Sequence, residues 1–477
     1  MPREKYVHKL NTIEKIVIIS VPIFVIGLAI NAKYGIFPIL SENQCHAFYI
    51  AIVTSLAAIL AIVFAISLIA IQHAADKYTP NILERYKDDR RIKGMYLIFS
   101  LGIVFGVLAL WFGWNYNGAF FAFGLLAFCL MCLYFQFRSV VDFVNPRKLI
   151  EKLGEETLNK LTGKLKRVAL NFRENDHIRR NCLDLKVIAI KSIERREDDI
   201  CTESVNALKE IVEEYVKVLE EIMKTLSEES QKEEFVRDLQ RLNLDIFLPM
   251  LREIGVTAAR QRRGFVDGSG VMSAIESVYR GFGMVVATYE SSEMERAMER
   301  YLVDESNRTI YNIGEVVTAN KPDENDLAAV VKSLRYLYEE YVSNKGFEVQ
   351  TEGIIYYIYR FSIKAAEHQY YWIITDTLQF YDESIRKRTE DIEIITLIIS
   401  NSICMCAVGI KNLSQEQDRQ FLRNWCFSVL NHFLENKDFH EYFDKAKEYC
   451  SDYKKEIGEL KEQFEKFLKK SKGEKDG

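Results

Sequence analysis

The sequence predicts an all-α protein with four transmembrane helices, a large solenoid-like domain of helical hairpins and a C-terminal heptad helix. Three observations predict this fold. Residues 1–138 contain long uncharged apolar segments, and residues 139–435 repeat apolar side chains at helical spacing. Residues 436–477 combine a heptad pattern with a charged tail.

The four expected spans are about residues 16–32, 47–72, 94–114 and 118–137. Each approaches or exceeds the roughly 20 apolar residues that cross a hydrocarbon core, and none contains Asp, Glu, Lys or Arg. No small-x-small cleavage site follows the first segment, so we expect a retained span and not a signal peptide.

The charges between the spans predict their orientation. Lys and Arg favour the cytoplasmic side, and they gather before the first span and between the second and third. We therefore expect a multi-pass protein of the cell (inner or plasma) membrane with both termini cytoplasmic. The basic residues on that side are Arg3, Lys5, Lys9, Lys15, Lys77, Arg85, Lys87, Arg90, Arg91 and Lys93, whereas residues 33–46 hold only Lys33.

The second span runs on into charge without a glycine or proline before Pro80. Thr79 and Pro80 are typical of a helix start, and a short amphipathic helix is expected after them. This helix has two interpretations. It could lie under the lipid headgroups, or it could couple the spans to the following domain through Asp76, Pro80 and Arg85.

The segment AIVFAISLIAIQHAADKYTPNILERYKDDRRIKGMYLIFSLGIVFGVLAL resembles a prokaryotic membrane protein family called domain of unknown function 2254. Phe64-Ala65 stands in place of the family's Phe-Ser pair, and the segment 76–81 in place of its Pro-containing segment. A fainter similarity covers residues 184–212, which lack the family's Pro and Asn between 193 and 199. The resemblance, over about residues 50–215, implies a multi-span protein with a cytoplasmic α domain and no assigned chemistry.

The end of the chain spaces its apolar residues by three and four over four heptads. Two interpretations stay open: an amphipathic last helix folded onto the array, and a self-associating coiled coil. The residues are Phe439, Phe443, Ala446, Cys450, Tyr453, Ile457, Leu460, Phe464 and Phe467.

Composition and motifs give no sign of an enzyme, a cofactor or a metal site. The acidic excess lies in residues 139–477, which argues against a nucleic-acid partner. The nine cysteines lack the spacing of zinc ligands and are expected as buried free thiols. A weak candidate for an anionic ligand or a lipid headgroup is the basic cluster Arg260, Arg262 and Arg263.

The spans suggest a function through their small residues. Gly102 and Gly106 favour close packing between helices. A row on span two could instead line a narrow pore in a homo-oligomer, gated by the helical domain. Its residues are Thr54, Ala57, Ala58, Ala61, Ala65 and Gln72. This channel hypothesis, with an unknown ion or small ligand, is preferred over a membrane-anchored scaffold or sensor whose helical domain binds a protein or small ligand.

Overall fold

A computed structural model gives the fold of the chain, and its described regular elements are α-helices and one short 3-10 segment. The prediction of an all-α protein is therefore confirmed over the described part. Contacts divide the chain into two compact units, residues Met1–Leu149 and Ile150–Gly477. The structure describes residues 42–79, 81–88, 90–111, 144–163, 176–225, 247–261, 270–287, 292–319, 323–343, 348–387, 392–433 and 439–473, with isolated positions between 126 and 142.

The first unit is built on α2 (Glu42–Lys77), a continuous helix of 36 residues. It contains the second expected span and its extension into charge, as predicted. The backbone N–H of Ile82 donates to the carbonyl of Thr79 over 3.2 Å, where α3 (Asn81–Asp88) begins. The third expected span lies in α4 (Arg90–Trp111).

Two helices in the described part are long and apolar enough to cross a membrane, so four spans are not confirmed. One is the part of α2 from His46 to Lys77, and the apolar part of α4, Phe99–Leu108, is shorter. The expected spans 16–32 and 118–137 lie outside the described residues, apart from isolated positions in the second of them. The structure therefore supports α2 as a span and leaves the other three as predictions.

Helices α2 and α4 pack through a small apolar core and through glycine. Tyr49, Leu56 and Phe99 are buried in this core. Gly106 is also buried, and a Cβ atom there would overlap the side chain of Val53. The absence of a side chain at this position allows the two helices to approach closely.

The short helix α3 does not offer its apolar side to lipid. Ile82 is fully buried and Tyr86 is 5% exposed, while Glu84 and Lys87 are exposed. Helix α3 contacts both α2 and α4. The apolar face of α3 at Ile82 and Tyr86 therefore packs against protein, and the position of the helix under the lipid headgroups stays a prediction.

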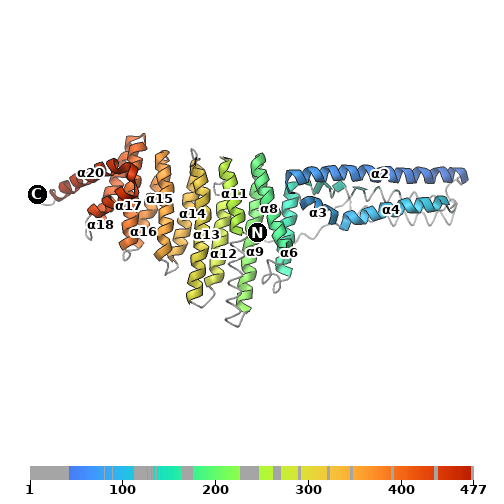
Figure 1. The fold of residues 1–477 in the computed structure, drawn as a ribbon, viewed down its shortest axis with the longest axis horizontal. Helices are drawn as coiled ribbons and strands as arrows, with labels where there is room; N and C mark the ends of the chain where they lie inside the picture. Colours follow the sequence, from blue (N-terminus) through green and yellow to red (C-terminus); the bar gives the residue numbers. More distant parts are fainter. Residues whose placement is uncertain are drawn as a thin grey trace. The chain divides into compact units, whose positions relative to one another are not determined.

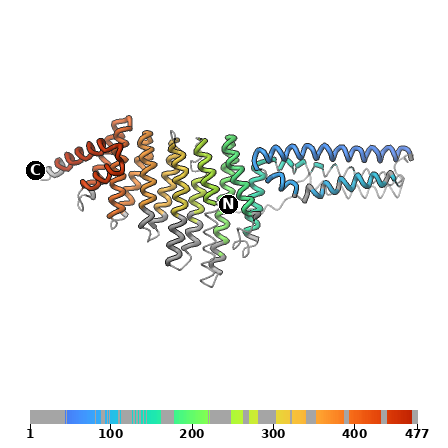
Figure 2. Tube along the Cα trace, viewed as in Figure 1, coloured from blue at the N-terminus to red at the C-terminus, as the bar shows by residue number. Residues whose placement is uncertain are grey.

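The second unit is an array of helices that follow one another side by side (Figures 1 and 2). It confirms the predicted helical-hairpin organisation. Its helices are α8 (Asp176–Arg195), α9 (Asp198–Thr225), α11 (Leu248–Arg260), α12 (Val271–Ala287), α13 (Ser292–Thr318), α14 (Glu324–Ser343), α15 (Glu348–Glu367), α16 (Tyr371–Lys387), α17 (Ile392–Asn412), α18 (Glu416–Phe433), α19 (Phe439–Tyr449) and α20 (Lys454–Gly473), and α6 (Pro146–Gly163) begins before them.

The helices of the array alternate between two layers. The first layer contains α9, α12, α14, α16 and α18, each in contact with the next. The second contains α8, α11, α13, α15 and α17 in the same relation, and every hairpin joins one layer to the other. Each helix contacts only close neighbours, as in α-solenoids.

The apolar core lies between these layers, and α17 is its most deeply buried helix. By length and composition α17 could also cross a membrane, but 83% of its most apolar 18-residue segment is buried inside the protein. Apolar side chains surround its whole circumference, from Ile394 through Ile403 to Val408. Helix α17 is therefore a core helix of the array.

The predicted heptad helix is not continuous, because the chain folds back at Cys450. Helix α19 ends at Tyr449, the Cys450 backbone is non-helical (φ −122°, ψ 62°), and α20 begins after a 3-10 turn. The resulting hairpin places the ring of Phe464 5.6 Å from that of Phe439 and 5.3 Å from that of Phe427 in α18. Heptad residues thus pack on one another and on the array, which matches the first of the two interpretations.

The contact between α13 and α15 gives a testable prediction. A Cβ atom at Gly314 would lie within 2.8 Å of three ring atoms of the fully buried Phe361. Gly314→Ala should therefore lower the free energy of unfolding by about 1–3 kcal/mol. Thermal unfolding of the purified protein, followed by tryptophan fluorescence, measures the change.

Gly353→Ala is the matched control. Gly353 also lies inside a helix, α15, but nothing lies within 4 Å of the position of its Cβ. Alanine there should stabilise the helix by up to about 1 kcal/mol. Equal shifts for the two variants would contradict the close approach of α13 and α15.

Candidate functional site

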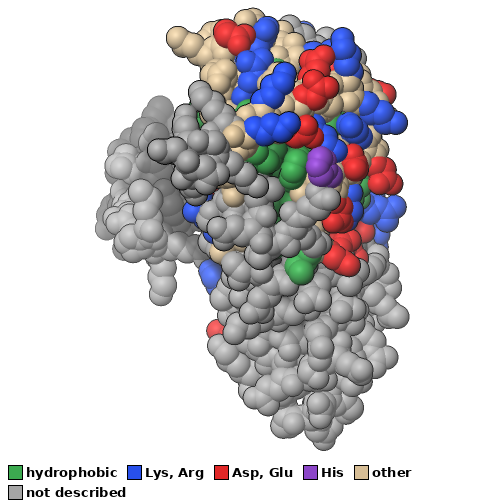
Figure 3. Space-filling view, turned by 90° about the vertical axis from the view of Figure 1, so that its left-hand side faces the viewer, with side chains coloured by type: hydrophobic (Ala, Val, Ile, Leu, Met, Phe, Trp, Pro, Cys, Tyr) green, Lys and Arg blue, Asp and Glu red, His purple; other side chains and the backbone are tan. Residues whose placement is uncertain are grey.

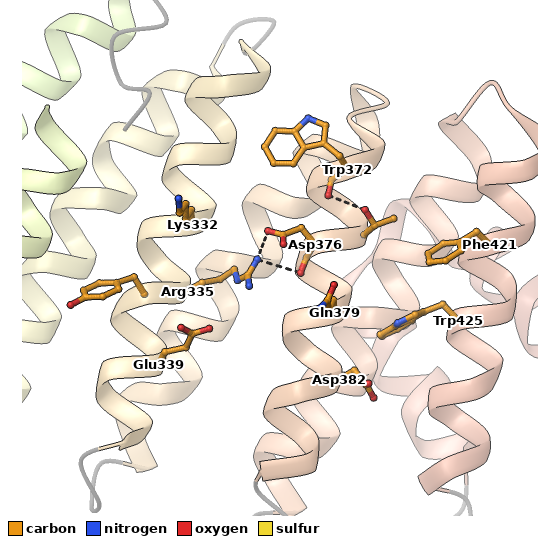
Figure 4. Close-up of a pocket in the computed structure, with 11 residues that line it drawn as sticks. Lys332, Arg335, Glu339, Trp372, Asp376, Gln379, Asp382, Phe421 and Trp425 are labelled. Carbon is orange, nitrogen blue, oxygen red and sulfur yellow. Dashed lines mark hydrogen bonds and ion pairs between the residues drawn. The ribbon is translucent and has the colours of Figure 1, made fainter. Parts of the chain in front are cut away.

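The strongest candidate site is a groove of about 860 Å³ across three helices of the first layer, α14, α16 and α18. Figure 4 shows side chains from all three helices turned toward it. A second hollow of about 320 Å³ shares Asp382 and Trp425 with the groove. The groove is lined by Lys332, Arg335, Tyr336, Glu339, Trp372, Thr375, Asp376, Gln379, Asp382, Phe421 and Trp425, and the hollow adds Arg386, Ser428, Val429 and Asn431.

Helical periodicity turns these side chains outward. On α14 the lining residues are spaced by three and four, while Leu334 and Leu337 between them are fully buried. The same holds on α16, where Ile374 and Leu378 are buried. One face of each helix thus serves the core and the opposite face serves the groove.

Aromatic side chains form the apolar part of the groove. Trp372 is 47% exposed and Phe421 is 46% exposed, and the two rings line the same groove. Tyr371 holds Phe421 in an edge-on contact with ring centres 6.1 Å apart. Trp425 lies where the groove meets the second hollow.

In the polar part of the groove, two arginines donate hydrogen bonds to residues of neighbouring helices. Arg335 of α14 donates to the carboxylate of Asp376 in α16, and also to its backbone carbonyl over 3.3 Å. The same guanidinium lies over the ring of Phe380, 4.8 Å from its centre. Arg280 of α12 donates to the hydroxyl of Tyr336 over 2.7 Å. Charged and aromatic contacts therefore set the spacing of neighbouring helices on this side.

The charges of the groove balance one another. Arg386 donates to Asp382 over 3.0 Å, and Arg335 pairs with Asp376. Lys332 and Glu339 are exposed, and the structure gives neither an ion-pair partner among the described residues. Seen from the end of the array that carries α20, Lys and Arg also alternate with Asp and Glu (Figure 3). Such a surface does not favour a polyanion.

The residues predicted as pore-lining lie on α2 and do not join the groove. All of them are exposed on the described structure: Thr54, Ala57, Ala58, Ala61, Ala65 and Gln72. The core of α2 with α4 uses other positions, such as Ile52 and Leu56. The row therefore remains available for contact with lipid, with another span or with a second copy.

The other predicted residues are not brought together either. Asp76 is exposed near the end of α2 and Arg85 is half-buried on α3, while Pro80 lies outside the described residues. Arg260 is exposed at the end of α11, and the other two members of its cluster, Arg262 and Arg263, also lie outside them. The weak anion site therefore gains no support from the described part.

Sequence reasoning missed the groove. Its one visible signal is a pair of tryptophans, Trp372 and Trp425, in otherwise polar helix faces. Neither a motif nor a spacing joins them, because they lie on α16 and α18, which are separated in the sequence by α17. Among the described residues no group of three His, Cys, Asp or Glu side chains could hold a metal ion. The arrangement offers recognition through stacking and hydrogen bonds.

Comparisons with known proteins bear on the membrane part. The family described as "Predicted membrane protein (DUF2254)" matches residues 15–211, which confirms the resemblance and extends it to the first expected span. No curated protein matches the chain. A solved structure described as "Computational Design of Self-Assembling Cyclic Protein Homooligomers" is 12% identical, covers 60% of this chain and 97% of its own, and has a TM-score of 0.19.

Proposed function

We propose, from the match to a membrane protein family, that this chain is a membrane-anchored scaffold whose helical array binds a segment of another protein. The groove across α14, α16 and α18 is the observation that carries this proposal. The α2 span provides the anchor, and the array provides the recognition surface.

The form of the groove favours a protein segment over a small molecule. Small-molecule sites are mostly enclosed and bury most of their ligand. Here Trp372 and Phe421 stand about half exposed on an open surface that crosses three helices. Tryptophan, tyrosine and arginine dominate the energetics of protein interfaces, and all three line this groove.

The polar groups of the groove suit an extended backbone. Gln379 and Thr375 line the groove and Asn431 the second hollow, and the oxygens of all three side chains can accept hydrogen bonds from a bound segment. Lys332 and Glu339 lie seven positions apart on α14, close to two helical turns, and offer one charge of each sign. The partner we expect therefore has aromatic or aliphatic side chains between charges of both signs.

Removal of the tryptophans tests the groove. A photo-reactive phenylalanine analogue at Gln379, in the full-length protein in its native membrane, should cross-link a specific polypeptide. Trp372→Ala with Trp425→Ala should lower this cross-linking by at least about tenfold, since buried aromatic anchors typically contribute about 2 kcal/mol or more. Quantitative mass spectrometry of the cross-linked product gives the readout.

Two controls make the result decisive. The same analogue at Glu448, an exposed position on α19, should not capture that polypeptide. The double alanine variant should keep the wild-type circular dichroism and melting temperature. Undiminished cross-linking at Gln379 in a folded double variant would rule out the groove as the binding site.

The array must lie on the same side of the membrane as its partner. We propose that this side is the cytoplasm. The balance of Lys and Arg around the expected spans supports this orientation. In a cysteine-free variant of the protein, His440→Cys should react with a membrane-impermeant maleimide only after cell lysis, whereas Asn115→Cys between the third and fourth expected spans should react on intact cells. Labelling of residue 440 on intact cells would contradict this orientation and indicate the opposite one.

A second candidate function is a homo-oligomeric channel. The observation that favours it is the row Ala57, Ala61 and Ala65, which is exposed on α2, whereas α2 contacts Gly106 of α4 through Val53. Copies of α2 could approach through this row around a narrow pore. In this proposal the array would act on the gate through Asp76, Pro80 and Arg85.

Tryptophan on the alanine row tests the channel. If the mass of the protein in detergent shows an oligomer, Ala61→Trp should abolish ion flux into liposomes, because the indole would fill a narrow axis. Ile66→Trp is the control, since Ile66 is 53% exposed about 100° or more around the helix from this row. A monomer, or equal flux in both variants, would exclude the pore.

A further inference from the structure

A pair of thiols meets where α17 contacts the break between α19 and α20. The Cys404 Sγ atom of α17 lies 3.2 Å from the carbonyl oxygen of Ala446, and the backbone N–H of Cys450 donates to the same oxygen over 2.9 Å. The single S–H of Cys404 can turn from this oxygen to the sulfur of Cys450, which lies beside it. Two thiols 46 positions apart in the sequence therefore share one small site.

The surroundings give the two sulfurs different chemistry. The hydrogen bond from Cys404, with a second from the Tyr359 hydroxyl, holds the pKa of Cys450 below its usual range despite burial. Burial and the hydrogen bond to Cys450 raise the pKa of Cys404 well above its usual range. Of the two sulfurs, Cys450 therefore has the lower pKa, and the thiolate is the reactive form of cysteine.

The backbone adds to this difference. Cys450 has non-helical dihedral angles and terminates α19, and its side chain is 7% exposed, whereas Cys404 is fully buried within α17. A residue between two helices can adjust its backbone to the geometry that a disulfide requires, while one inside a helix cannot do so as easily. Of the two residues, Cys450 is the one with any exposure to solvent.

The chain contains its own comparison pair. Cys406 of α17 and Cys426 of α18 also contact each other through their thiols, but Cys426 is 1% exposed and both lie inside helices. Burial, followed by the hydrogen bond to Cys426, raises the pKa of Cys406 well above its usual range. This pair has the same thiol–thiol contact as the first pair, but both of its members lie inside helices and no helix break adjoins it.

We propose that Cys404 and Cys450 form a disulfide when the protein meets hydrogen peroxide, and that this bond ties the C-terminal hairpin to α17. The Cys450 thiolate attacks one peroxide oxygen: an S–O bond forms, the O–O bond breaks and hydroxide leaves. The Cys404 sulfur then attacks that of Cys450: the S–S bond forms, the S–O bond breaks, and the departing hydroxide takes the Cys404 proton. The two cysteines lose two electrons and a peroxide becomes two waters, one of them formed from the first hydroxide and a solvent proton.

Peptide mapping tests the proposal on the full-length protein in detergent. Brief exposure to peroxide, followed by alkylation of the remaining thiols, should yield the Cys404–Cys450 cross-linked peptide and leave Cys406 and Cys426 alkylated after denaturation. The oxidised protein should melt at a higher temperature, since the bond restricts the unfolded chain. A protein in which both pairs remain reduced, or in which Cys406–Cys426 forms first, would overturn the proposal.

The pH dependence of disulfide formation distinguishes a cysteine of lowered pKa from two thiols that are merely close together. The rate of disulfide formation should rise with pH and level off below the ordinary thiol pKa of about 8.5. Tyr359→Phe removes one donor to Cys450, so the inflection should move to higher pH. An inflection at or above the ordinary value in the wild type, or one unchanged in a folded Tyr359→Phe variant, would contradict the assigned role of Tyr359 and Cys450. Neither result depends on the ligand of the groove.

Discussion

The burial of apolar side chains between two layers of helices is the constraint on which the array depends. Helix α17 is apolar around its whole circumference, and it can be so because α15, α16, α18 and the C-terminal hairpin enclose it. Helices in the first layer need only one apolar face, since their other face is outside. The groove of Trp372, Arg335 and Trp425 exists on those outer faces. Most of its side chains lie outside the apolar core, although Arg335 also lies over the ring of the buried Phe380.

The fold could be predicted to a large extent because helical patterns are local. Periodicity, scarce proline and the run of α2 into charge each depend on neighbours in the sequence, and the structure bears them out. Pro146 and Pro249 illustrate the point, since both lie in the first turn of a helix. The groove could not be predicted in this way, because Arg335 and Asp376 meet across a helix boundary 41 positions apart.

The heptad tail shows where a local pattern has more than one solution. Spacings of three and four predict an apolar stripe, and a stripe can face another copy or fold back on its own chain. The non-helical backbone at Cys450 lets the stripe fold back on its own chain. Phe427 of α18 then contacts Phe464 of the folded-back helix. No proline or glycine stands at Cys450, and the local signal is limited to Ser451 and Asp452, residue types that favour turns and helix starts. The break satisfies tertiary packing rather than local preference.

The position of the groove near one end of a nearest-neighbour array has a consequence for its dynamics. Internal hairpins of such an array are held from two sides, whereas a terminal hairpin is held from one, so opening is expected to start at the ends. Helix α18 carries Phe421 and Trp425 and is itself backed by α20 through Phe427 and Phe467. Fraying of α20 would therefore loosen one wall of the groove before any other part of it. The slowest amide hydrogen exchange should belong to interior helices such as α15, and the lifetime of a bound segment should follow the closure of the last hairpin.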